Sequence, residues 1–218
     1  MAGFPFRLVT TDLDGTLTAG HGWGFLAERL GQRRQFDETQ QRFASGGIGE
    51  DEHLRNLLAI AEGAPRRVVL RVLADTPRVA GIHEGIRRIH EAGAKIALLT
   101  HNPAYVSGWY ERKFGFDAAD GIAESPKFRA GLVGPNGDAR ADKPAALARL
   151  RTKFGVAPTE VAHVGDGRAD AAIFPMVGLG VAFGARDPLV RKAADVTVEG
   201  RDFQRVVDAL ERHPPVRS

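Results

Sequence analysis

The clearest hydrophobic pattern lies near the start of the chain, where an apolar, β-branched run from Phe6 to Thr11 leads to Asp12. A short continuous run of this kind predicts a buried strand. The residues that follow are Asp-Leu-Asp-Gly, and glycine permits the backbone to turn sharply. The sequence therefore predicts a strand that ends in an acidic loop.

The pattern changes to helical spacing from Trp23 to about Asp75, where apolar residues recur three or four positions apart. Glycine-containing breaks interrupt it at Gly31, at Gly46-Gly47 and at Gly63-Ala64-Pro65. We expect roughly four short helices here, without a strand to add to a sheet. The segment should form a helical cap inserted after the first strand. The predicted domains are a core of residues 1–19 and 77–218 and a cap of residues 20–76.

Strand and helix signals alternate after Pro77. The predicted strands are 95–100, 161–164, 180–183 and 195–198, and the predicted helices are 82–92, 103–114, 143–154, 169–177 and 202–211, with a further short helix before the last strand. Between these elements, the turn-rich sequence after Phe114 is strand-like, and Asn136-Gly137 suggests a hairpin. Such alternation predicts an α/β fold with a Rossmann-like, doubly wound parallel sheet covered on both faces.

The amino-acid composition limits the classes of protein and of partner that we expect. The chain of 218 residues suits one α/β domain with a modest insertion, and its 43% apolar and 26% charged residues are ordinary for a globular protein. The formal charge is +3, but basic residues occur in pairs such as Arg33-Arg34, without interleaved aromatic residues. We expect no nucleic-acid partner, although a mild positive field favours anionic small substrates.

The chain has no cysteine, which excludes disulfides, thiolate zinc sites and cysteine nucleophiles. No apolar run approaches the ~18 residues that a membrane span needs, and the first residues do not resemble a secretion signal. We therefore expect a cytoplasmic protein with no membrane partner. The number of subunits is left open.

Acidic residues follow two of the predicted strands. Asp12 and Asp14 lie two positions apart at the end of the first, so their carboxylates should face the same side, and Asp166 and Asp170 follow the strand 161–164. The carboxyl ends of parallel strands are where ligands bind in doubly wound sheets. Clustered carboxylates repel one another and need a cation, and hard oxygen ligands without cysteine or histidine suit Mg²⁺.

A hydroxyl and an ammonium group complete the predicted site. Thr100 closes the strand 95–100, and Lys143 opens a helix as Asp-Lys-Pro. These groups suit the oxygens of a phosphoryl group, whose transfer depends mostly on positioning and charge neutralisation. Lys127 is an alternative candidate for the ammonium group, and Lys143 could instead be a surface residue.

Together these motifs resemble the haloacid dehalogenase superfamily. Its four motifs match, in order, Asp12 to Thr18, Thr100, Lys143 and Gly165 to Asp170, and the helical insertion resembles the cap of its phosphoserine-phosphatase-like branch. The resemblance implies that Asp12 forms an aspartyl-phosphate, that Asp14 is the general acid and base, and that Thr100 and Lys143 hold the phosphate. It also implies that Asp12, the Asp14 main-chain carbonyl and Asp166 bind Mg²⁺, with Asp170 in support directly or through water.

Specificity is where the resemblance weakens. Phosphoserine phosphatases carry a glutamate and an arginine that bind the amino and carboxyl groups of the serine moiety. In this chain the corresponding positions hold His21 and Leu57. We therefore predict weak or no activity on phosphoserine, and a phosphatase for another small ester such as a sugar, nucleotide or carboxylic-acid phosphate. The alternatives are a phosphoserine phosphatase proper, a phosphomutase and, from other classes, a phosphoacceptor signalling module or a non-catalytic binding protein.

Histidines and an asparagine near the motifs are candidate substrate contacts. His101 and Asn102 follow Thr100, and His21 lies where the cap begins, although His101 could fill a turn and His21 could face solvent. The remaining histidines have no paired spacing typical of a zinc site, and most are expected in surface or loop positions. They are His53, His83, His90, His163 and His213.

Overall fold

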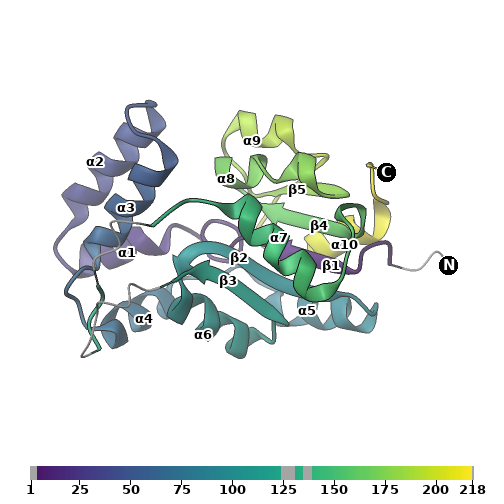
Figure 1. Cartoon of the computed structure of the whole chain (residues 1–218), viewed down its shortest axis with the longest axis horizontal. Coiled ribbons are helices and arrows are strands. Elements are labelled where there is room, and N and C mark those ends of the chain that lie inside the picture. Colours follow the sequence, from purple (N-terminus) through teal and green to yellow (C-terminus); the bar gives the residue numbers. More distant parts are fainter. Residues whose placement is uncertain (1–3, 124–130, 135–138, 218) are drawn as a thin grey trace.

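The core of the protein is a parallel sheet, seen in a computed structural model that describes residues 4–123, 131–134 and 139–217 (Figure 1). Its six strands lie in the order β3-β2-β1-β4-β5-β6. The strands are β1 (Leu8–Thr11), β2 (Lys95–Pro103), β3 (Ala118–Ile122), β4 (Val161–Gly165), β5 (Leu179–Phe183) and β6 (Val196–Val198). The order changes direction at β1, which lies between β2 and β4, and this switch point is where a doubly wound sheet opens a crevice. The predicted fold class is confirmed.

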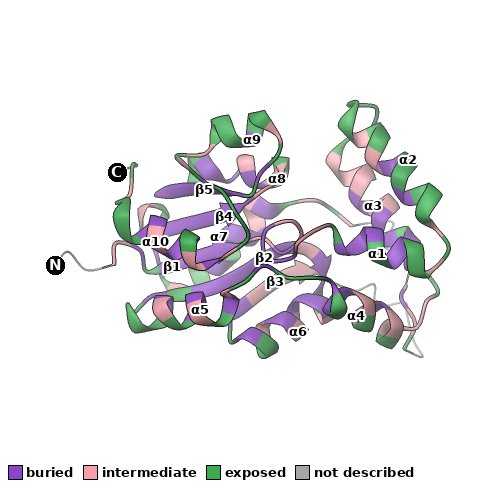
Figure 2. Ribbon diagram, turned by 180° about the vertical axis from the view of Figure 1, so that it is seen from behind, coloured by how far each residue is buried: buried purple, intermediate pink, exposed green. Residues whose placement is uncertain are grey.

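Helices cover both faces of the sheet, because successive residues of each strand point to opposite sides. Val9 and Leu98 pack into one apolar cluster with the helices α5 and α10, whereas Leu8 and Leu99 pack into another with α7. Figure 2 shows the resulting band of buried strands between more exposed helices. The helices of the core are α5 (Ile82–Glu91), α6 (Ala104–Phe114), α7 (Lys143–Phe154), α8 (Arg168–Ala171), α9 (Pro188–Ala193) and α10 (Gln204–Arg212).

Four helices between β1 and α5 form a separate group at the end of the molecule away from both termini (Figure 1). They are α1 (Gly22–Arg29), α2 (Arg33–Ala44), α3 (Glu50–Ile60) and α4 (Arg66–Asp75), and they agree with the predicted helical segment. Trp23, Phe36 and Leu54 are buried within the same large apolar cluster as the sheet residues, so the group packs onto the core. The Tyr110 hydroxyl of α6 donates to the Leu73 carbonyl of α4 at 3.0 Å. The domain boundaries themselves stay a prediction.

Some predicted elements need correction. The helix expected over 169–177 ends at Ala171 and gives way to a 3-10 turn, Phe174–Met176, because Pro175 has no N–H to continue the helical bonding. Strand β2 runs on to Pro103, past the predicted end at Thr100. The sequence after Phe114 contributes the edge strand β3, and the hairpin suggested at Asn136-Gly137 lies outside the described residues. Among the described helices, none is long and apolar enough to cross a membrane.

Candidate active site

The loop after β1 carries the first pair of carboxylates. The Asp12 amide donates to the Val164 carbonyl at 2.9 Å, which fixes the end of β1 beside β4. Gly15 has a φ of +83°, and a Cβ there would lie 2.2 Å from the Asp166 carboxylate, so the turn requires glycine. The next residue, Thr16, donates its hydroxyl to Asp166 at 2.7 Å. The two acidic loops are thereby held against each other.

The loop after β4 carries the second pair of carboxylates. Asp170 is fully buried, and one of its oxygens accepts from the amides of Asp166 at 3.1 Å and Gly167 at 2.9 Å. A Cβ on Gly165 would lie 2.1 Å from the Asp170 carboxyl carbon, so glycine is what allows this carboxylate to fold back onto its own loop. Asp170 therefore shapes the loop that presents Asp166.

Lys143 is buried at the start of α7, between the two loops. Its ammonium nitrogen lies 3.0 Å from an oxygen of Asp12 and donates to an oxygen of Asp170. Burial opposes the charge, but the two carboxylates outweigh it and hold the pKa of Lys143 above its usual value. Burial also opposes the charge of Asp170, but Lys143 and His163 keep the pKa of that carboxyl below its usual range. Lys143 and Asp170 thus form a buried ion pair. Lys127, the alternative candidate for the ammonium group, lies outside the described residues.

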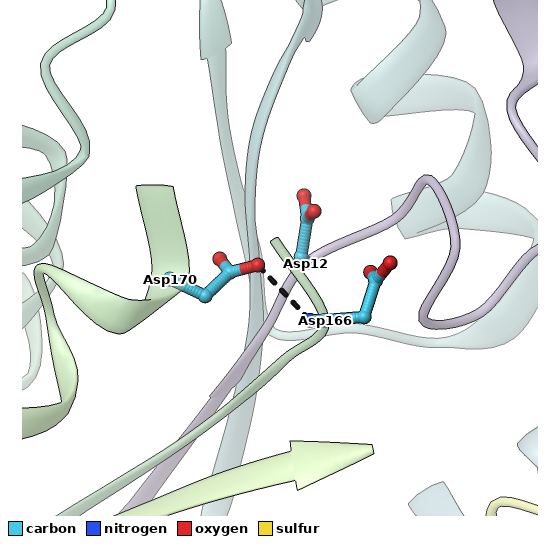
Figure 3. Close-up of side chains that lie close together, drawn as sticks. All are labelled: Asp12, Asp166 and Asp170. Atoms are coloured by element: carbon cyan, nitrogen blue, oxygen red, sulfur yellow. Dashed lines mark hydrogen bonds between the residues drawn. The ribbon is translucent and has the colours of Figure 1, made fainter. Parts of the chain in front are cut away.

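Three carboxylates, those of Asp12, Asp166 and Asp170, gather at the sheet edge, each with an oxygen within 4.8 Å of the others (Figure 3). Burial and the neighbouring carboxylates raise the pKa of Asp12 well above its usual value, against the opposing effect of Lys143. Burial and Asp170 raise the pKa of Asp166 to about 7. Such crowding favours a cation. Both oxygens of Asp170 already accept hydrogen bonds, so Asp12 and Asp166 are the better placed ligands of the three.

Asp14 is held by two donors from different parts of the fold. One oxygen accepts from the amide of Gly22, the first residue of α1, at 2.9 Å, and the other accepts from the Asn102 side chain at 2.7 Å. Asn102 also donates to the Thr100 hydroxyl at 3.0 Å. Both described hydrogen bonds of the Asn102 side chain are thus made with Asp14 and Thr100, and they position these two residues.

One cavity of about 260 Å³ joins all nine residues that the sequence singled out. They are Asp12, Asp14, His21, Thr100, His101, Asn102, Lys143, Asp166 and Asp170. A larger hollow of about 680 Å³ lies beside it but takes in only Asp14, His21 and Asp166 of that set. The smaller cavity is therefore the candidate active site, with the motif residues on one side and helices α1 to α3 on the other.

The structure also places polar residues here that the sequence did not single out. Gln40, Glu50 and His53 line the cavity from α2 and α3. His163, expected in a surface or loop position, is instead fully buried in β4, where its ring nitrogens lie 2.9 Å from the Thr10 hydroxyl and 3.1 Å from Asp170. That expectation was wrong because strand β4 lies at the centre of the sheet, where both faces are covered.

Comparison with known proteins agrees with this geometry. A family model described as haloacid dehalogenase-like hydrolase matches residues 6–178, and the chain belongs to that family. The phosphoserine phosphatase of Archaeoglobus fulgidus is 27% identical over 208 residues, which cover 94% of this chain and 60% of that relative. The phosphoserine phosphatase of Wolinella succinogenes is 24% identical over 206 residues, covering 94% of this chain and 100% of the relative.

Solved structures show the same fold. A phospho-aspartyl intermediate analogue of phosphoserine phosphatase superposes with a TM-score of 0.81 at 20% identity, covering 94% of this chain and 98% of the other. A substrate-bound phosphoserine phosphatase complex also has a TM-score of 0.81, at 19% identity. At such identities the likeness concerns the fold alone.

Proposed function

We propose that this hydrolase is a phosphatase that cleaves a small phosphate monoester through an aspartyl-phosphate on Asp12. The observation that carries the proposal is the convergence of Asp12, Lys143 and Asp166 with Asp14 and Thr100 around one cavity. Its relatives are phosphoserine phosphatases, and one structural neighbour is an analogue of the phospho-aspartyl intermediate.

In the proposed reaction, a carboxylate oxygen of Asp12 bonds to phosphorus while the ester P–O bond breaks. Asp14 donates a proton to the leaving alcohol oxygen, and then takes one from the water that releases inorganic phosphate from Asp12. Lys143 and Thr100 bind the non-bridging phosphoryl oxygens. Asn102 and the Gly22 amide keep Asp14 beside Asp12 through their hydrogen bonds to its carboxylate.

The carboxylates fit a hard divalent cation, which we propose is Mg²⁺. Asp12 and Asp166 offer oxygen ligands, and the main-chain carbonyl of Asp14 is the third proposed ligand. Asp170 supports them by holding the loop, through its bonds to the amides of Asp166 and Gly167. When bound, Mg²⁺ would neutralise charge on the carboxylates and the phosphoryl group.

We further propose that phosphoserine is a poor substrate. Leu57 and His21 line the cavity, and the sequence comparison above assigns them to the positions of the arginine and the glutamate that bind serine in phosphoserine phosphatases. The basic lining residue Arg168 is paired with Asp187 at 2.9 Å, and Lys143 is paired with Asp12 and Asp170. A serine carboxylate would therefore find no arginine or lysine free to pair with it among the described lining residues.

The test is phosphate release from a panel of monoesters with Mg²⁺, repeated with a chelator and with Asp12→Asn. We expect both treatments to abolish release, and Asp208→Asn on the distant helix α10 to leave it unchanged. Activity that survives chelation and Asp12→Asn contradicts the mechanism. Turnover without release of inorganic phosphate indicates a phosphomutase instead.

The expected cytoplasmic location stays a prediction.

A further inference from the structure

The wall of the cavity opposite the acidic loops comes from the helical segment. Its polar residues there are His21 before α1, Gln40 of α2, and Glu50 and His53 of α3, and His101 lines the same cavity from β2. The ring of His53 stacks on Phe43 with centroids 4.1 Å apart, which fixes its orientation. In a phosphatase of this arrangement, the alcohol half of the substrate would contact this wall.

Three nitrogens of these side chains are shielded from solvent without a hydrogen-bond partner among the described residues. They are Nε2 of Gln40, Nε2 of His53 and Nε2 of His101. A buried polar atom without a partner is destabilising, and native proteins contain few of them. The three residues all line one cavity, where a bound molecule is the available source of hydrogen-bond partners.

Among the side chains that α2, α3 and β2 contribute to this wall, Glu50 is the one carboxylate. Burial lowers the pKa of both His53 and His101 to about 4, so both imidazoles are neutral near pH 7. Neutral imidazole and amide groups bind hydroxyl groups but do not balance a carboxylate. Burial raises the pKa of the Glu50 carboxyl, which offers an acceptor for a hydroxyl proton.

A metal ion is a poor alternative occupant for this wall. The described residues bring three metal-ligand atoms within 4.8 Å of one another only at Asp12, Asp166 and Asp170. His53, His101 and Glu50 do not form such a group. Hydrogen bonding is therefore the chemistry that the wall supports.

We infer that the leaving alcohol is a small, uncharged polyol or sugar, whose hydroxyl groups bind Gln40, His53 and His101 and donate to Glu50. This inference rests on the proposed phosphatase function. Hydroxyl groups both donate and accept, so they satisfy neutral nitrogens and a carboxylate together, whereas an ammonium group only donates. The cavity of about 260 Å³ lies below the ~300–1,000 Å³ of typical ligand pockets, so it suits a small alcohol.

The test compares six monoesters under the same conditions with Mg²⁺. Glycerol phosphate and ribose phosphate have neutral hydroxylated alcohols, whereas phosphoserine, phosphoglycerate and phosphoethanolamine carry charges there. Nitrophenyl phosphate has no hydroxyl on its leaving group and reports on the phosphatase machinery alone. We expect kcat/KM for glycerol phosphate or ribose phosphate to exceed that of each charged ester by about tenfold or more.

Variants of the wall test the assignment of residues. Gln40→Leu and His53→Phe should each lower the ratio of kcat/KM for the preferred polyol ester to that for nitrophenyl phosphate by about three- to tenfold. Gln41→Leu, at an exposed neighbour on α2, and His213→Phe, at an exposed residue after α10, are matched controls that should leave the ratio unchanged. Calorimetric binding of the preferred ester to Asp12→Asn gives a second readout, and the same wall variants should weaken it.

Each outcome bears on a different part of the argument. If nitrophenyl phosphate is hydrolysed but a charged ester is preferred, or if the wall variants leave the ratio and the binding unchanged, the inference is wrong while the phosphatase function stands. If none of the six esters releases phosphate, the proposed function fails and this inference fails with it.

Discussion

Replacing Lys143 with methionine would separate its structural role from its proposed catalytic one. The side chain is 3% exposed, lies 3.0 Å from Asp12 and donates to Asp170. Methionine fills a similar space without the charge. The fully buried Asp170 and the partly buried Asp12 would then lose their counter-charge, and removing one partner of a buried ion pair typically costs about 3–5 kcal/mol.

We expect Lys143→Met to lower the free energy of unfolding by about that amount, 3–5 kcal/mol, in urea titrations with a chelator present. A preorganised group that faces developing charge typically contributes a factor of about 10²–10³ to the rate, so kcat/KM should fall by at least as much. The exposed Lys192→Met on α9 is the matched control, and a surface change of this kind should stay within about 0.5 kcal/mol.

The double variant Lys143→Met with Asp170→Asn is the decisive comparison. It removes one of the two uncompensated charges, that of the fully buried Asp170. The introduced amide keeps an oxygen that can accept from the amides of Asp166 and Gly167, as the Asp170 carboxylate does now. Stability should recover by more than half of the loss, whereas activity should not recover. A double variant no more stable than Lys143→Met, or a single variant as stable as the wild type, would refute the ion-pair argument.

Two further predictions concern side chains around the cavity. Asn102→Ala removes the 2.7 Å hydrogen bond to Asp14, so kcat should fall about tenfold or more with KM little changed, and an unaltered kcat in steady-state assays would contradict the positioning role. His101 has its pKa lowered from 6.5 to about 4 by burial, so the unfolded chain takes up this proton first and stability falls as pH drops from 6.5 towards 4. The contribution is at most roughly 3 kcal/mol, and His101→Asn should flatten the pH dependence of the urea midpoint over that range.

The catalytic half of the site could be predicted because its residues lie at strand ends. Asp12 follows β1 and Asp166 follows β4, and adjacent parallel strands bring their carboxyl ends to the same edge whatever the intervening chain does. The pairing of His163 with Asp170 could not be predicted in this way, because no sequence pattern marks a histidine within an apolar strand as the partner of a carboxylate. It also left β3 without clear bounds, since Ala-Ala-Asp-Gly-Ile lacks a β-branched run.

The cavity wall that would contact the alcohol half of the substrate could be identified from the structure but not from the sequence. Glu50, His53 and Leu57 share one face of α3 by helical spacing, but that face carries leucines too, so the sequence alone does not distinguish a cavity lining from apolar packing. Gln40 reaches the same cavity from α2, and its position depends on how α2 and α3 pack against each other and against α1. Strand ends are placed by backbone pairing, whereas the wall is placed by the docking of helices through Trp23, Phe36 and Leu54. Substitutions at those packing positions should therefore shift substrate preference even though none of them lies in a catalytic motif.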